Sequence, residues 1–195
     1  SSIVRAAELA VPFEAAGPDG LPAGFSVGLT GGGPAPVWVR HSGDGGSVLV
    51  QTSTDRTDYR FPLAIYDKAT VADVAVSVRF LAESGSVDRA AGIAVRLKDA
   101  NNYYVIRANA LEDNVNFYRM TDGMRREIQG ASVKVASGVW HVLGLRAQGD
   151  RFTASFDGTV LFAATDRTIA GVGKVALWTK ADSVTRFAGL SIETL

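Results

Sequence analysis

The chain has 195 residues, of which 47% are hydrophobic and 21% are charged, a balance that is typical of a folded protein and excludes a disordered one. Its 20 basic and 20 acidic residues cancel, so no net field draws it to a nucleic acid or to an anionic membrane surface. It has no cysteine, which excludes disulfides, thiol nucleophiles and cysteine-type zinc sites.

The length of the chain fits a single domain, because all-β domains run to about 200–250 residues without dividing. No apolar run reaches the roughly 18 residues that a membrane span needs, so no membrane insertion is expected. The opening stretch SSIVRAAELAVPFEAA lacks the charged and apolar regions of a signal peptide. The oligomeric state is left open by the sequence.

Residues 1–70 are predicted to be rich in loops. Glycine and proline are frequent in AAGPDGLPAG, LTGGGPAP and HSGDGGS, which are predicted to be loops between short strands. The segment SIVRAAELA is the only candidate helix, and it is too short to form a layer of its own.

Residues 71–195 are predicted to form a regular meander of strands. Each segment alternates with a period of two or is rich in β-branched and aromatic residues. The segments are VADVAVSVRF, AAGIAVRL, YYVIRANA, NVNFYRM, REIQGA, VWHVLGLRAQ, RFTASFDG, TVLFAAT, GKVALWTK and VTRFAGLSI. Hairpin turns are expected at residues 149–150 (GD) and 157–158 (DG). About a dozen antiparallel strands are therefore expected in an all-β, two-sheet sandwich or jelly roll.

Three segments carry a resemblance to a known superfamily. They are AGIAVRLKDANNYYVIRA, WHVLGLRAQGDRFTASFDGTVLFAATD and GVGKVALWTKADSVTRFAGLSI. They resemble the concanavalin A-like lectin/glucanase jelly roll, and within it the laminin G-like and 3-keto-disaccharide hydrolase domains of bacterial proteins. The resemblance implies a carbohydrate partner and a periplasmic or secreted location. Relatives often carry an acidic residue after the aromatic of the last strand, where this chain has Phe187, Ala188 and Gly189.

The arrangement of carboxylates argues against a laminarinase-type glycosidase. Such enzymes place two carboxyl groups about 5 Å apart, which alternate positions on one strand achieve. No two acidic residues of this chain lie at positions i and i+2, so the Glu-x-Asp-x-Glu signature is missing. A carboxylate pair assembled from different strands stays open. An enzyme acting on 3-keto sugars stays open, with Glu112 and Asp113 as candidate acid/base groups and Arg107 or Lys180 steadying an oxyanion. The alternative is that Glu112 and Asp113 are solvated turn residues.

Histidine and metal chemistry receive little support from the sequence. His141 alternates in step with Leu143 and Leu145, so its side chain is predicted to point to the same face and to pack there with one ring nitrogen hydrogen-bonded. His41 is predicted to lie in a loop. There is no Gly-x-Ser-x-Gly elbow. Oxygen donors in EDNVN (residues 112–116) raise the possibility of Ca²⁺, but the spacing matches no recognised loop, so a structural turn is favoured and no metal or other cofactor is assigned.

Polar side chains on the strand from residue 103 to 110 predict a binding face. Alternation places Tyr103, Arg107 and Asn109 opposite the core residues Tyr104 and Ile106. Such a polar set is expected to face water, a groove or a buried network.

Neighbouring segments supply companions to this set: Arg96, Tyr118, Trp178 and Lys180, to which Trp38 adds a further ring. If the strands are adjacent, the set forms an open face. On it, an aromatic ring stacks on a sugar, and the planar N–H donors form paired hydrogen bonds with the sugar hydroxyls. We expect a carbohydrate-binding lectin-like domain of a bacterial envelope or secreted protein. A glycoside hydrolase acting on 3-keto or related disaccharides and a structural scaffold are the alternatives.

Overall fold

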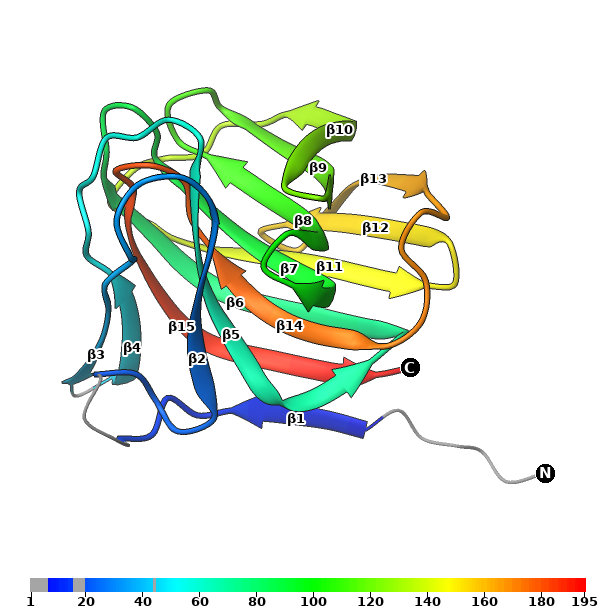
Figure 1. Ribbon diagram of the computed structural model, residues 1–195, viewed down its shortest axis with the longest axis horizontal. Coiled ribbons are helices and arrows are strands. Elements are labelled where there is room, and N and C mark those ends of the chain that lie inside the picture. The colour runs from blue at the N-terminus through cyan, green and yellow to red at the C-terminus, as the bar shows by residue number, and fades with distance from the viewer. Residues whose placement is uncertain (1–6, 16–19, 44) are drawn as a thin grey trace.

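The chain folds into two antiparallel β-sheets packed face to face, with no helix in the residues described (Figure 1). The computed structural model describes residues 7–15, 20–43 and 45–195. Every strand pairing within them is antiparallel. The arrangement is a two-sheet antiparallel sandwich of the jelly-roll type, as the sequence predicts.

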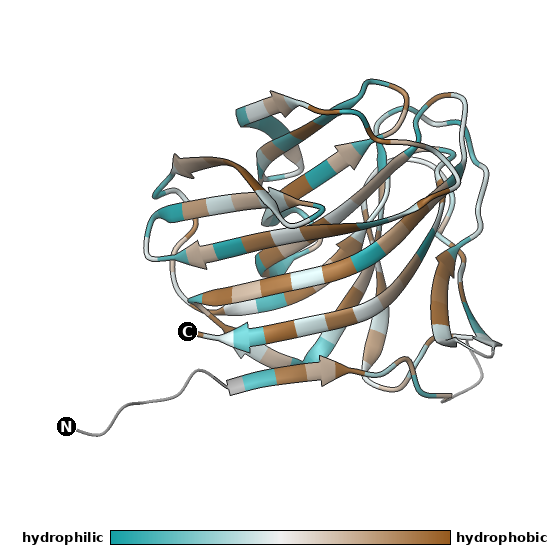
Figure 2. Ribbon diagram, turned by 180° about the vertical axis from the view of Figure 1, so that it is seen from behind, coloured by the Kyte–Doolittle hydropathy of each residue, from teal (hydrophilic) through white to brown (hydrophobic). Residues whose placement is uncertain are grey.

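Sheet I has the strand order β13-β12-β11-β6-β15-β4-β3, and β1 pairs with the free part of β15. Its strands are β1 (Ala7–Val11), β3 (Trp38–Gly43), β4 (Gly46–Gln51), β6 (Val74–Ser84), β11 (Trp140–Gln148), β12 (Arg151–Phe156), β13 (Thr159–Thr165) and β15 (Val184–Thr194). Figure 2 shows the outer side of this sheet.

Sheet II has the strand order β10-β9-β8-β7-β14-β5-β2 and lies in front in Figure 1. Its strands are β2 (Phe25–Gly31), β5 (Arg60–Val71), β7 (Ala90–Asp99), β8 (Asn102–Asn109), β9 (Asn114–Thr121), β10 (Met124–Ser132) and β14 (Gly173–Trp178). The run from β7 to β10 is a meander in which each strand pairs with the next.

The main core lies between the two sheets, because apolar residues alternate along the strands and point inward. Figure 2 shows the alternation of hydropathy along the strands of sheet I. Aromatic rings from both sheets meet in this core. Tyr104 and Phe117 of sheet II contact Phe152 of sheet I, with ring centroids 4.4 and 4.8 Å from it. Burial of such rings is the dominant stabilising term in a sandwich of this kind.

A second apolar layer covers the outer face of sheet II. Phe61 and Trp178 stack there at a centroid distance of 5.3 Å, and neither ring is accessible to solvent. The Tyr103 hydroxyl accepts a hydrogen bond of 3.2 Å from the Trp178 indole and lies 2.8 Å from Thr30 Oγ1. Burial raises the pKa of Tyr103 to about 12, so the phenol stays neutral. This sheet is thus packed with side chains on both faces.

The expected turns and most expected strands are present. Both hairpins form where predicted, at residues 149–150 and 157–158. The prediction of loops over residues 1–70 is wrong in part, because β1 to β4 and most of β5 lie there, and His41 belongs to β3. The candidate helix is also wrong where it is described: Ala7–Val11 is a strand, and residues 1–6 lie outside the described part of the chain. No described segment forms a helix that is long and apolar enough to cross a membrane.

Candidate functional site

The candidate site lies on the outer face of sheet II, where β8, β9 and β10 run side by side. We call it the arginine–tyrosine cluster and define it as Arg107, Asn116, Tyr118, Arg125 and Glu127. The strand register produces it, since Arg107 lies opposite Asn116, and Tyr118 lies opposite Glu127. Paired residues of an antiparallel sheet project to the same face, so these side chains are direct neighbours.

Both guanidinium groups of the cluster contact the Tyr118 ring. The Arg125 guanidinium carbon lies 4.3 Å from the ring centroid and that of Arg107 lies 5.3 Å from it. Arg125 also lies over Phe61, at 5.2 Å. Cation–π attraction therefore holds two cations at fixed positions on this face. The role of Tyr118 is to position the arginines, because Arg125 covers its ring.

Each of these arginines keeps one buried N–H group without a hydrogen-bond partner among the described residues. The two atoms are Nε of Arg107 and Nη1 of Arg125. The Nη2 group of Arg107 is held by the side chain of Asn114 and by Glu112, whose Oε2 lies 3.4 Å from it. An unpaired buried donor costs about 1–3 kcal/mol, and Nε of Arg119 is another such atom among the described residues.

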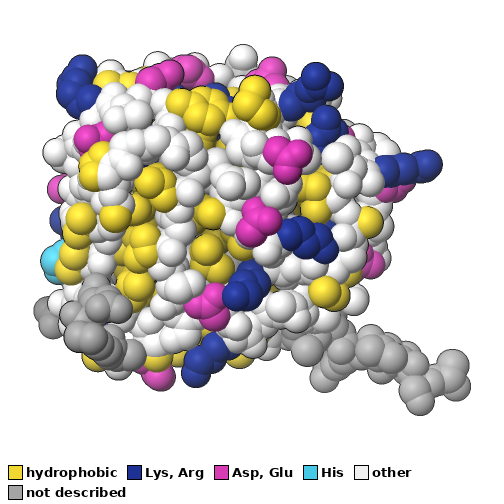
Figure 3. All heavy atoms as spheres, in the orientation of Figure 1, with side chains coloured by type: hydrophobic (Ala, Val, Ile, Leu, Met, Phe, Trp, Pro, Cys, Tyr) yellow, Lys and Arg dark blue, Asp and Glu magenta, His cyan; other side chains and the backbone are white. Residues whose placement is uncertain are grey.

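Hydrogen-bond acceptors lie directly beside these donors. The Asn116 side-chain amide donates to Glu127 Oε1 at 2.5 Å and to the Tyr118 hydroxyl at 3.2 Å. Glu127 is exposed, and Asn116 and Arg125 are half-buried. Figure 3 shows this outer face, on which acidic and basic side chains are scattered among apolar ones. The cluster therefore offers fixed donors and accessible acceptors together.

A buried ionic group adjoins the cluster at the end of β14. Lys180 Nζ lies 2.8 Å from Asp58 Oδ1 and 3.0 Å from Asp88 Oδ2, and Asn109 donates to the other oxygen of Asp88 at 2.5 Å. Burial alone would lower the pKa of Lys180, but its hydrogen bonds to both carboxylates raise that pKa above the ordinary value. The same contact lowers the pKa of Asp58. The lysine is therefore charged and held in place.

The structure brings six of the seven predicted ligand-binding residues to this one face. They are Tyr103, Arg107, Asn109, Tyr118, Trp178 and Lys180. The expectation of an open hollow lined by them is wrong, because all six are buried and at most 8% exposed. Tyr103, Tyr118 and Trp178 are themselves part of the second apolar layer, so Trp178 presents no free ring to a ligand. Their role in binding stays a prediction.

Arg96 does not belong to this face, and its placement there is wrong. Its backbone φ is +50°, in a bulge that interrupts the pairing of β7 between Val95 and Asp99. The bulge reverses the expected alternation. The side chain instead donates to the carbonyls of Ala72 at 3.0 Å and Gly149 at 2.6 Å and lies over Phe152. Arg96 thus joins the two sheets at their edge.

The other candidates have mainly structural contacts. Asp113 has a φ of +51°, accepts the N–H of Val135 at 3.0 Å and pairs with Lys134. The hydrogen bond from Val135 is the main reason that the pKa of Asp113 is lowered, which makes it a poor proton donor. Glu112 is 54% exposed beside Arg107. Trp38 is buried against Phe187 in the main core, so it adds no ring to the face.

No metal centre is evident within the described ranges, where no three His, Asp or Glu side chains are grouped to hold an ion. The oxygens of the EDNVN segment have separate partners: Asn114 contacts Arg107, and Asp113 contacts Lys134. His141 packs between Phe80 and Phe156, as predicted. Both of its ring nitrogens are bonded, one to Asp157 and one to the Ala136 carbonyl, rather than one alone.

Sequence reasoning missed Arg125 and Glu127 of the cluster and the buried partner Asp88. The alternation of Arg125 and Glu127 with Ile128 on β10 was the available signal, since Ile128 packs against the core. Asp88 lies in a loop, and no periodicity marks it.

No protein-family model matches the sequence. No curated protein is significantly similar to it. Solved structures are similar in fold. The carbohydrate-binding module CBM66 from Bacillus subtilis superposes with a TM-score of 0.68 at 20% identity, over 88% of this chain and 96% of the module. A β-glucanase from Bacillus licheniformis superposes with a TM-score of 0.62 at 15% identity, over 96% of this chain and 98% of the enzyme. At such identities, the likeness is one of fold.

Proposed function

We propose that this protein is a carbohydrate-binding domain without catalytic activity and that the arginine–tyrosine cluster holds the sugar. The hydrogen-bond donors of Arg125, a half-buried guanidinium fixed on Tyr118 beside the exposed carboxylate of Glu127, carry the proposal. A sugar presents ring and hydroxyl oxygens that accept such hydrogen bonds, and its hydroxyls donate to a carboxylate such as Glu127. The fold is supporting evidence, because it is shared with a carbohydrate-binding module and a β-glucanase.

The cluster is suited to binding because its donors are fixed before a ligand arrives. Tyr118 holds both guanidinium groups, and the Tyr59 hydroxyl accepts the N–H of Arg125 at 2.9 Å and donates to the Gly123 carbonyl at 2.7 Å. Less side-chain entropy is then lost on binding. Tyr59 is 41% exposed and provides an aromatic contact beside Arg125.

The finer parts of the proposal follow the sequence resemblance. We infer a bacterial envelope or secreted setting, in which polysaccharides are the available partners. Hydrolysis of 3-keto disaccharides stays an alternative, for which Glu112 is the remaining candidate acid beside Arg107. A binding role is favoured because the other candidate acid, Asp113, already accepts a hydrogen bond from the backbone N–H of Val135.

A glycan array with the intact protein tests this proposal, followed by titration calorimetry with each glycan that binds. Arg125→Met removes the donor and retains most of the apolar contact, so affinity should fall at least about tenfold, the effect of about 1.4 kcal/mol. Arg126→Met is the matched control, because Arg126 is exposed and lies on the opposite face of β10. Absence of any glycan binding, or equal loss in both variants, would overturn the proposal.

A further inference from the structure

The outer face of sheet I carries a trough that crosses the strands. Its floor is a lateral row of small residues, since Ser155 lies opposite Gly144, Gly144 opposite Ser77, and Ser77 opposite Ser191. The row runs over β12, β11, β6 and β15. These residues line a hollow of about 350 Å³, a volume within the usual range of about 300–1,000 Å³ for ligand sites.

Gly144 leaves room for the serine side chains of this floor. A Cβ at Gly144 would lie 2.4 Å from Ser155 Oγ, so a larger residue there would shift the Ser155 hydroxyl. Three serine hydroxyls lie at the bottom of the trough, spaced by the strand separation of about 4.8 Å or multiples of it. That of Ser191 donates to Glu8 Oε1 at 3.0 Å. A row of hydroxyls suits a ligand that makes repeated weak polar contacts along its length.

Charged groups of both signs border the trough. Arg146 lies on one side of the floor with Glu193, and Glu193 is opposite Glu8 of β1. Arg79 follows Ser77 on the same face of β6. None of these four residues has an ion-pair partner among the described residues. A polyanion would be repelled by the two glutamates, and a polycation by the two arginines, so the lining favours an uncharged ligand with many hydroxyls.

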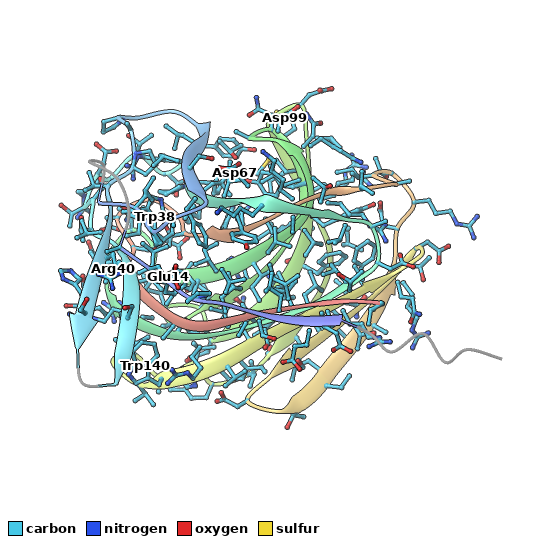
Figure 4. The ribbon with its side chains drawn as sticks, turned by 90° about the horizontal axis from the view of Figure 1, so that it is seen from below. Glu14, Trp38, Arg40, Asp67, Asp99 and Trp140 are labelled. Atoms are coloured by element: carbon cyan, nitrogen blue, oxygen red, sulfur yellow. The ribbon has the colours of Figure 1, made fainter. Side chains whose placement is uncertain are left out.

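A second hollow of about 280 Å³ lies farther along the same face, between Trp140 of β11 and the β3–β4 hairpin. Arg79, Arg186 and Trp140 line it. Trp140 is 40% exposed, and the Arg79 guanidinium lies 5.6 Å from its ring centroid. Figure 4 shows Trp140 on the side of the sandwich opposite Asp67 and Asp99, which belong to sheet II. An exposed indole is the surface on which the apolar face of a sugar ring stacks.

We propose that this trough is a second binding site, for an extended neutral polysaccharide, independent of the arginine–tyrosine cluster. Trp140 stacks on one sugar, Arg79 and the serine row contact the following sugars, and Arg146 with Glu193 contact the far end. From Trp140 to Arg146 the site spans six residues of β11, or about 20 Å, which accommodates several sugar units. With sites on both outer faces, one molecule bridges two polysaccharide chains.

Acrylamide quenching of tryptophan fluorescence tests this site directly. Trp38 and Trp178 are at most 2% exposed, so acrylamide reaches Trp140 above all. The probes are soluble polysaccharides: a mixed-linkage glucan, a fructan, a xylan and a galactomannan, with polygalacturonate as the acidic comparison. A neutral polysaccharide that binds should protect Trp140 from quenching, and Arg125→Met should leave this protection unchanged.

Two variants separate the trough from the rest of the surface. Ser77→Leu fills the floor without touching Trp140 and should abolish the protection, whereas Arg151→Gln, on the same sheet but lining neither hollow, should not. Affinity electrophoresis of Trp140→Ala should show binding weakened about tenfold. The proposal is wrong if no neutral polysaccharide protects Trp140, if only polygalacturonate does, or if Ser77→Leu is protected as well as the parent chain.

Discussion

The Tyr104 hydroxyl of sheet II donates a hydrogen bond of 2.6 Å to the carboxylate of Asp166, which follows the last strand of the β11–β13 meander in sheet I. The same hydroxyl accepts the N–H of Ile169 at 3.0 Å, and the carboxylate pairs with Arg119 at 2.6 Å. Burial opposes ionisation of Asp166, but these hydrogen bonds outweigh it and lower its pKa. This contact fixes one sheet against the other.

Tyr104→Phe should therefore destabilise the protein by about 1–3 kcal/mol, because it leaves Ile169 N–H and one oxygen of Asp166 without their buried partner. Urea denaturation of both proteins measures the difference. The control is Tyr66→Phe, whose hydroxyl makes no hydrogen bond within the described residues, and it should change stability little. Equal effects of the two substitutions would contradict the role given to Tyr104.

Asp182→Asn should lower stability at pH 7 by about 2–3 kcal/mol, because the Asp182 carboxylate accepts backbone N–H groups of Ser86, Val87 and Asp88 at 2.9–3.1 Å. Burial would raise the pKa of Asp182, but these hydrogen bonds lower it below 3.8. A carboxyl group whose pKa is lower in the folded state stabilises the fold when the pH is above its unfolded-state pKa. This stabilisation is lost as the pH falls through its folded-state pKa. The difference between the two proteins should thus shrink below about pH 4.

The measurement is thermal unfolding across a pH series. Asp122→Asn is the control, since Asp122 is exposed in the β9–β10 turn. A difference for Asp182→Asn that stays constant down to pH 2 would contradict the assignment.

Gly92→Ala should destabilise by about 1–3 kcal/mol through overpacking. A Cβ at this position would lie 2.9 Å from both the Trp178 ring and the Ile106 carbonyl oxygen. Gly45→Ala is the matched substitution, because nothing lies within 4 Å of the added carbon, and it should be neutral. Calorimetric unfolding temperatures distinguish the two. A neutral Gly92→Ala would mean that the second apolar layer of sheet II is loosely packed.

Lys180→Met should cost about 3–5 kcal/mol, because it leaves the Asp88 carboxylate buried without its cation. Lys174→Met breaks an exposed pair with Asp67, at 2.8 Å, and should cost at most about 1 kcal/mol. Guanidinium denaturation at equal ionic strength compares them. Similar losses in both variants would show that the Lys180 group is open to water.

The alternation of apolar residues after residue 71 was sufficient to predict the meander and the two-sheet architecture. Turn residues such as Asp157 and Gly158, both with positive φ, marked the hairpins. Alternation also placed Arg107, Asn109 and Trp178 on one face. It gave no information on what covers that face, because a period of two separates the sides of a sheet without indicating whether water or side chains lie beyond.

The missed features depend on contacts between distant segments. The bulge that turns Arg96 away is fixed by carbonyls of residues 72 and 149, far from it in the chain. The strand β1 is short, and its pairing with β15 supplies the stability that its own residues lack. The second apolar layer arises because Phe61 of β5 and Trp178 of β14 become neighbours only after folding.

The position of β15 in the interior of sheet I constrains the order in which the molecule folds. This strand pairs with β6, β4 and β1. Three segments from the first half of the chain therefore complete their sheet only after residues 184–194 have been synthesised. The β7–β10 meander needs only local contacts and can form while the ribosome is still translating the rest. Because non-local pairings slow folding, we expect maturation to be limited by a late docking step, during which the unpaired edge of β6 is exposed to aggregation and to chaperones.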